Sequence, residues 1–78
     1  MKVERADIIQ AIREANVVSD ANSLRNDVQL VDQGLDSLGF LNVLLILGEK
    51  HNIEVPDEDI DRLTTIDAIV AYMNERLA

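Results

Sequence analysis

The sequence predicts an all-α fold, a small bundle of three main helices plus one short helix with a long first loop. Three observations support this. Apolar residues recur at helical spacing in three segments of the 78-residue chain. Residues 16–36 lack that spacing, and Pro56 interrupts the chain between the second and third segments. A chain of this length accommodates one domain, so we expect residues 1–78 to form a single domain.

The first helix is expected from about residue 4 to residue 15, because Ile8, Ile9, Ile12 and Ala15 fall on one helical stripe. The connection that follows is rich in Asn, Ser and Asp, with a few apolar residues scattered through it. Loops this long are uncommon in compact domains and usually carry function. We therefore expect residues 16–36 to form a functional loop that a few apolar contacts hold in place.

The second helix is expected over residues 37–51, with Asp36 as its N-cap. At about 100° per residue, two faces separate. The predicted core face comprises Phe40, Val43, Leu44, Leu47 and His51. The opposite face comprises Leu38, Leu41, Asn42, Leu45 and Glu49. Its three leucines indicate either a contact surface, as exposed apolar patches often do, or a helix that is buried all round.

The last third of the chain is expected to hold a short acidic helix over residues 57–62 and a final helix. The final helix is expected to start near Thr64, since Asp67 follows at capping-box spacing. Its predicted buried stripe is Ile66, Ile69, Val70, Met73 and Leu77.

Composition excludes several classes of function. The chain has 15 acidic and 7 basic residues, a formal charge of −8, which repels nucleic acid phosphates and anionic membrane surfaces. It has no cysteine, which excludes disulfides, thiolate catalysis and zinc–thiolate sites. The charged N-terminus does not resemble a secretory signal, and the longest apolar run, residues 43–47, is too short to span a bilayer. We expect a cytoplasmic protein without membrane insertion.

The candidate functional residue is Ser37, at the first position of the second helix. A Ser–His catalytic pair is excluded because His51, the one histidine, lies 14 residues along the same helix, roughly 21 Å away. A phosphate attached to Ser37 would meet unpaired N–H groups and the positive end of the helix dipole. The alternative is an ordinary residue at a helix start.

A metal site is not expected either. Asp57, Asp59 and Asp61 open like an EF-hand loop, but Arg62 and Ala68 occupy the positions that require Gly and Glu. With no base, metal or nucleophile constellation, the sequence does not predict an enzyme.

Two segments resemble the acyl carrier protein family. Residues 34–38 read GLDSL, similar to the family's attachment motif, and residues 53–73 read IEVPDEDIDRLTTIDAIVAYM, similar to its third and fourth helices. The resemblance covers nearly the whole chain. It implies a 4′-phosphopantetheine arm, donated by coenzyme A and attached to Ser37 by a phosphodiester. The arm's thiol would carry acyl groups as thioesters, so the cofactor would bring the sulfur that the chain lacks.

The resemblance also implies partners. These are a phosphopantetheinyl transferase and the enzymes that load and process acyl groups, which would meet a monomeric carrier through basic and apolar patches. Asp36 would both cap the helix and present a carboxylate to the transferase. The implied docking residues are Leu38, Leu41, Asn42, Leu45, Glu49, Asp57, Glu58, Asp59 and Asp61.

The chain departs from the family pattern at several positions. Gly39, Asn42 and Gly48 stand where acidic residues are frequent, and Gln33 replaces a frequent leucine. These changes favour a specialised carrier of fatty acid, polyketide or related lipid biosynthesis, docking more by apolar contact than by charge. Gly39 and Gly48 either permit close approach by a partner or acyl chain, or local flexibility, or are merely tolerated by packing.

Two other functions fit the same residues. An aminoacyl or peptidyl carrier, loaded by an adenylating ligase, would use the same arm. A protein-interaction module of another class would leave Ser37 unmodified.

Overall fold

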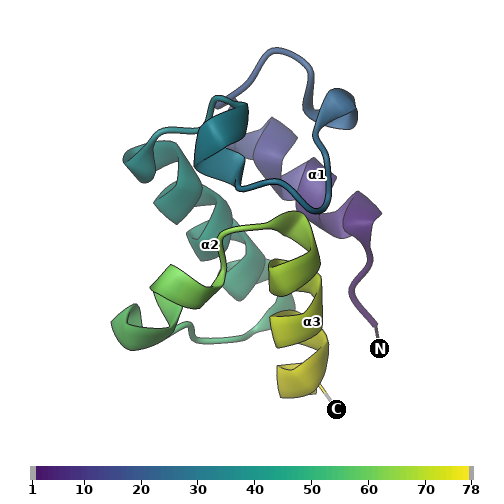
Figure 1. Cartoon of the computed structure of the whole chain (residues 1–78). Helices are drawn as coiled ribbons and strands as arrows, with labels where there is room; N and C mark the ends of the chain where they lie inside the picture. The colour runs from purple at the N-terminus through teal and green to yellow at the C-terminus, as the bar shows by residue number, and fades with distance from the viewer. Residues whose placement is uncertain (1, 78) are drawn as a thin grey trace.

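A computed structural model describes residues 2–77, and over that range all regular structure is helical (Figure 1). The main helices are α1 (Arg5–Ala15), α2 (Ser37–His51) and α3 (Ile66–Leu77). The short 3-10 helices are η1 (Ala21–Ser23), η2 (Leu30–Gln33) and η3 (Asp57–Arg62). The predicted all-α class is confirmed, with its three main helices, the short helix near residues 57–62 and the long first connection. Within residues 2–77 no helix has the length and hydropathy needed to cross a membrane.

The core lies where α1, α2 and α3 meet. The α2 residues Phe40, Val43, Leu44 and Leu47 are buried, as predicted. His51 is only half-buried, and its Nδ1 is enclosed without a hydrogen-bond partner among the described residues. The core side chains from the other elements are Val3, Ile8, Ile9, Ala11, Ile12, Ala21, Leu24, Leu30, Leu35, Leu63, Ile66, Ile69, Tyr72 and Met73. The prediction for α2 was therefore right along most of its inner face.

The start of α3 corrects a prediction. The helix begins at Ile66, and the Thr65 hydroxyl accepts a hydrogen bond from the Ala68 N–H at 3.0 Å, so Thr65 and not Thr64 supplies the cap. The Thr64 carbonyl instead accepts from the Leu30 N–H at 2.8 Å, and the Asp67 N–H donates to the Asn26 carbonyl at 3.1 Å. Both residues of the expected capping box thus use their backbone to hold the first loop.

The buried stripe of α3 also differs in part from the prediction. Ile66, Ile69 and Met73 are buried, whereas Val70 and Leu77 are half-buried at its edge. Tyr72, which the periodicity did not include, is buried with only 7% of its surface exposed.

The two glycines of α2 are explained by close contacts within the chain. A Cβ at Gly48 would lie 2.6 Å from the carbonyl oxygen of Ile53, and a Cβ at Gly39 would lie 2.6 Å from Val17 Cγ1. The Ile53 N–H also donates to the Gly48 carbonyl at 2.9 Å, so the chain folds back tightly after α2. The close approach at both glycines is made by the protein's own atoms and not by the partner or acyl chain that the sequence suggested.

We expect Gly48→Ala to destabilise the protein by about 1–2 kcal/mol, because displacing the backbone of Ile53 outweighs the gain in helix propensity. Urea unfolding of the variant and of the wild type measures this difference. Asn42→Ala, at an exposed position of the same helix, is the control and should change the free energy of unfolding by no more than about 0.5 kcal/mol. A Gly48→Ala protein as stable as the wild type would contradict the contact.

Asp59 joins η3 to α3. Its Oδ2 accepts hydrogen bonds from the Tyr72 hydroxyl at 2.7 Å and from Arg76 Nη2 at 3.0 Å. The Arg76 guanidinium also lies over the Tyr72 ring, 4.8 Å from its centroid. Only 14% of the Asp59 side chain is exposed. This corrects the expectation that Asp59 belongs to an exposed acidic docking surface, because its carboxylate is engaged within the fold.

Burial of the Tyr72 phenol, helped by its hydrogen bond to Asp59, raises the pKa of that group above 10.0. The unfolded chain therefore loses the phenolic proton before the folded chain does. Stability from this group is fully present below about pH 10 and falls as the pH rises through the raised pKa.

We expect the free energy of unfolding to decrease at alkaline pH more steeply in the wild type than in Tyr72→Phe. Urea unfolding of both proteins between about pH 8 and pH 11 measures this, and absorbance titration of the single tyrosine gives its pKa directly. Parallel pH dependence in the two proteins would show that Tyr72 does not contribute.

Candidate functional site

Ser37 is exposed at the first turn of α2, between buried anchors. Leu35, two residues before it, is buried, and Gly39 and Phe40 after it are buried as well. Gly34 has φ of 108°, a left-handed conformation that glycine adopts without strain, and it lets the chain turn from η2 into the helix. The flanking core contacts therefore hold the serine in place while its hydroxyl faces solvent.

Asp36 is the N-cap, as predicted. Its Oδ1 accepts a hydrogen bond from the Gly39 N–H at 2.6 Å, and its carbonyl accepts from the Phe40 N–H at 2.9 Å. Within residues 2–77 the N–H groups of Ser37 and Leu38 donate no hydrogen bond. These two free donors and the positive end of the helix dipole face the space around Ser37, which suits an attached phosphate.

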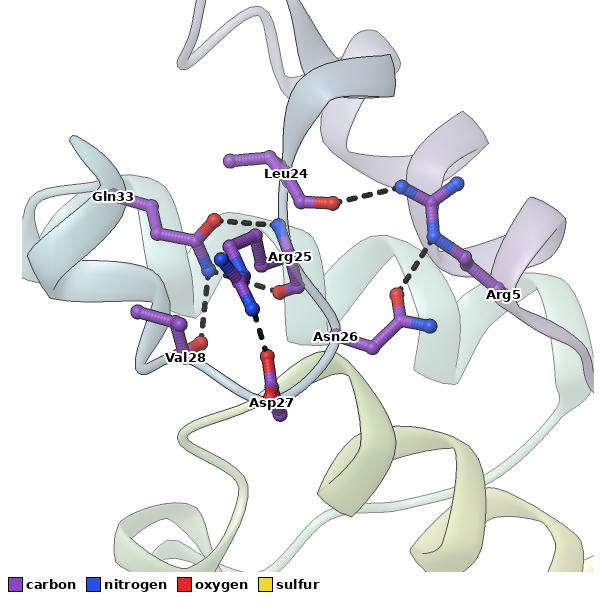
Figure 2. A network of polar contacts seen from close by, with 7 residues as sticks. All are labelled: Arg5, Leu24, Arg25, Asn26, Asp27, Val28 and Gln33. Atoms are coloured by element: carbon purple, nitrogen blue, oxygen red, sulfur yellow. Dashed lines mark hydrogen bonds and ion pairs between the residues drawn. The ribbon is translucent and has the colours of Figure 1, made fainter.

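The first loop supports this turn through a network of polar contacts (Figure 2). Gln33 Oε1 accepts from the Arg25 N–H at 2.6 Å, and Gln33 Nε2 donates to the carbonyls of Arg25 and Val28 at 3.0 and 2.8 Å. All of these hydrogen bonds join the side-chain amide of Gln33, the residue before Gly34, to the backbone of the loop. The replacement of a frequent leucine by Gln33 therefore has a structural explanation, which the sequence alone did not provide.

Arg5 anchors the same loop to α1. Its Nε donates to Asn26 Oδ1 at 2.7 Å, and its Nη2 donates to the Leu24 carbonyl at 2.8 Å (Figure 2). The same Nη2 also donates to the Asn22 carbonyl at 3.2 Å. Arg25 and Asp27 form an ion pair at 3.6 Å, but both side chains are largely exposed, so it contributes little. The first loop is therefore held by the side chains of Arg5 and Gln33, in addition to the backbone hydrogen bonds from the start of α3.

The outer face of α2 is exposed, which decides between the two interpretations of its leucines. Leu38, Leu41 and Leu45 are 74%, 42% and 60% exposed. Val31 on η2, which sequence reasoning missed, is 51% exposed. The helix is thus not buried all round, and its apolar outer face is free. The other predicted docking residues that are exposed are Asn42, Glu49, Asp57, Glu58 and Asp61.

A groove of about 690 Å³ runs between the second half of α2 and the segment that leads into η3. Its apolar lining comes from Leu41, Leu44, Leu45, Ile53, Val55 and Ile60. Glu49, Glu54 and Asp57 supply acidic groups along it. Sequence reasoning did not find this groove, because its two walls belong to segments that have no shared periodicity. The pair of apolar residues Ile53 and Val55, just before Pro56, was the one feature of the sequence that pointed to this groove.

Comparison with known proteins agrees with this arrangement. A family model described as "Phosphopantetheine attachment site" matches residues 6–73. The acyl carrier protein of Helicobacter pylori (strain J99) is 32% identical over 68 residues, covering 86% of this chain and 87% of the relative. The acyl carrier protein of Campylobacter jejuni (strain RM1221) is 30% identical over 69 residues, covering 87% and 90%. That of Helicobacter hepaticus is 30% identical over 66 residues, covering 83% and 87%.

The matched region contains all three main helices to within a few residues of each end, together with the turn that presents Ser37. Family membership also accounts for the absence of a catalytic constellation around the serine, because the members are carriers of a covalently attached 4′-phosphopantetheine and not enzymes. This chain belongs to the acyl carrier protein family.

Proposed function

We propose that residues 1–78 form a single carrier domain that holds acyl intermediates as thioesters on a 4′-phosphopantetheine arm attached to Ser37. The observation that supports this site is the position of Ser37 in the GLDSL turn, exposed at the start of a capped helix beside two free N–H donors. Asp36 holds the turn, and the helix end offsets the negative charge of the phosphodiester. When attached, the arm supplies the thiol for thioester chemistry.

Attachment requires a separate transferase. On attachment, the Ser37 oxygen would form a bond to the phosphorus of coenzyme A that bears the pantetheine. The P–O bond of the pyrophosphate would break, adenosine 3′,5′-bisphosphate would leave, and the hydroxyl proton would pass to a base. His51 lies at the far end of α2, so the transferase must provide that base. This chain contributes position and exposure of the hydroxyl, and the Asp36 carboxylate is a recognition group for the transferase.

The outer face of α2 is the proposed docking surface for the transferase and for the enzymes that load and process acyl groups. Leu38, Leu41 and Leu45 on α2 and Val31 on η2 are exposed and offer apolar contact. Charge on this face of α2 is limited to Glu49, while exposed carboxylates on η3 can steer basic partners. This balance supports a specialised carrier of fatty acid, polyketide or related lipid biosynthesis, acting as a cytoplasmic monomer.

The groove beside α2 is the proposed shelter for the apolar part of the cargo. It is lined by aliphatic side chains, and it begins at Leu41, about one helical turn beyond Ser37. Burial of apolar surface there would stabilise a loaded chain by about 25 cal/mol per Å² removed from water.

We expect wild-type protein to gain the mass of one phosphopantetheine arm when it is incubated with coenzyme A and a broad-specificity phosphopantetheinyl transferase. Ser37→Ala should gain none and should remain folded, because the side chain is exposed. Ser19→Ala, which removes another exposed loop hydroxyl, is the matched control and should be modified as the wild type is. Intact-mass spectrometry measures all three, and modification of Ser37→Ala would show that the attachment site lies elsewhere.

Variants of Asp36 separate its two proposed roles. Asp36→Ala should lose about 1 kcal/mol of stability through loss of the helix cap, whereas Asp36→Asn retains a capping oxygen and most of that stability. If the carboxylate is also recognised by the transferase, both variants should be modified several-fold more slowly than wild type. Wild-type rates in Asp36→Asn would leave Asp36 with the capping role alone. Urea unfolding and initial rates of arm transfer provide the two measurements.

A further inference from the structure

η3 forms part of one wall of the groove and contributes a single apolar side chain, Ile60, that packs against the core. None of its residues is buried, although Ile60 is half-buried and lines the groove with Val55 and Asp57. In Figure 1 this green segment lies at the lower left, at the edge of the bundle. A segment with so little buried surface is held weakly by apolar contact and belongs to the part of a fold that opens locally.

Asp59 provides the polar attachment of this wall. Among residues 2–77, the hydrogen bonds and ion pairs that connect η3 side chains to another element all involve its carboxylate. The acceptor is Oδ2, and both donors come from α3, the Tyr72 hydroxyl at 2.7 Å and Arg76 Nη2 at 3.0 Å. The Arg62 guanidinium, 3.7 Å from Oδ1, is largely exposed and belongs to η3 itself.

The two donors on α3 differ in burial, since the Tyr72 ring is buried in the core and the Arg76 side chain is 44% exposed. Tyr72 is 7% exposed, and its ring is packed on one side by the guanidinium of Arg76. Hydrogen bonds to an ionised carboxylate are shorter and stronger than neutral ones, and they are more valuable where water is largely excluded. With 14% of its side chain exposed, Asp59 meets this condition better than the other carboxylates of η3.

We propose that Asp59 is a positioning residue that, through Tyr72 and Arg76, holds η3 in place as a wall of the groove and so sets how firmly the groove encloses the apolar part of a cargo. This inference rests on the proposed function of the groove as a shelter. It assigns the Asp59–Tyr72–Arg76 contact a role distinct from docking, since the carboxylate faces α3 and not the outer face of α2.

The first test uses the protein without an arm. Hydrogen exchange of the amides that close η3, those of Asp59 and Leu63, should accelerate by about fivefold to tenfold in Tyr72→Phe and in Asp59→Asn, while exchange in α1 and α2 stays as in wild type. Tyr72→Phe removes only the hydroxyl and retains the ring in the core. Asp61→Asn is the matched control, because it removes an equal charge from an exposed position of the same helix, and it should leave exchange unchanged.

The second test measures shelter of a cargo. Each protein is loaded from octanoyl coenzyme A by the transferase, and cleavage of the octanoyl thioester by hydroxylamine is timed. We expect cleavage to be several-fold faster in Tyr72→Phe and Asp59→Asn than in wild type and Asp61→Asn. Cleavage after removal of the fold by urea gives the unsheltered limit for every protein.

The two tests separate the possible failures. If wild type is cleaved as fast as the unfolded protein, the groove does not shelter this cargo and that part of the proposed function fails. If wild type is protected but Tyr72→Phe is protected equally, or if exchange in η3 does not change, the positioning role of Asp59 is overturned. Faster exchange spread over α1 and α2 as well would show a general loss of stability and would also overturn it.

Discussion

The structure depends on burying one face of α2 while leaving the opposite face bare. Phe40, Val43, Leu44 and Leu47 provide the buried face, against which α1, the first loop and α3 are assembled. In a domain this small the core supplies only a few kcal/mol of net stability, so loss of one such side chain would matter. The exposed face can remain apolar because the buried face alone holds the helix in place.

The end of α2 that carries Ser37 depends on the loop before it more than on the helix itself. Gln33 closes that loop on its own backbone, Arg5 ties it to α1, and the backbone of Thr64 binds it to the approach to α3. The loop is therefore long but has defined contacts along most of its length. A carrier benefits from this arrangement, because a modifying enzyme must find the same exposed hydroxyl in the same orientation each time, and a fixed turn reduces the entropy lost on docking.

Some carboxylates of this protein bind groups within the fold, and others are exposed to solvent. The chain carries a net charge of −8, yet several carboxylates have partners within the fold. Asp36 caps α2, Asp7 and Glu4 cap α1 reciprocally, and Asp59 binds α3. The carboxylates of Glu49, Glu58 and Asp61 remain exposed and can act on partners at a distance, whereas the leucines of α2 act only on contact. In the proposed function, the carboxylates therefore steer the approach of a partner and the leucines of α2 make the contact.

The groove beside α2 likewise combines one wall from the core helix α2 with one wall from a less buried segment. The aliphatic lining from α2 faces η3, of which no residue is fully buried. In the proposed function, this wall of the groove opens around a cargo while the docking face keeps its shape. The tight backbone contact at Gly48 fixes the start of that segment, and the contact at Asp59 fixes its middle.

The sequence by itself determined the helical class, the span and most of the inner face of α2 and the cap at Asp36, because these follow from local periodicity and capping chemistry. Periodicity left the exposure of the three leucines of α2 open, and the packing of the other helices decided it. Tertiary structure alone decided what depends on contacts between distant segments. Thr65 caps α3, because the backbone groups of Thr64 and Asp67 bind the first loop. The Gln33 side chain binds the loop backbone, and the Asp59 carboxylate is largely buried by its contacts with Tyr72 and Arg76. A local sequence pattern does not predict these hydrogen bonds, because they join segments that come together only when the helices pack.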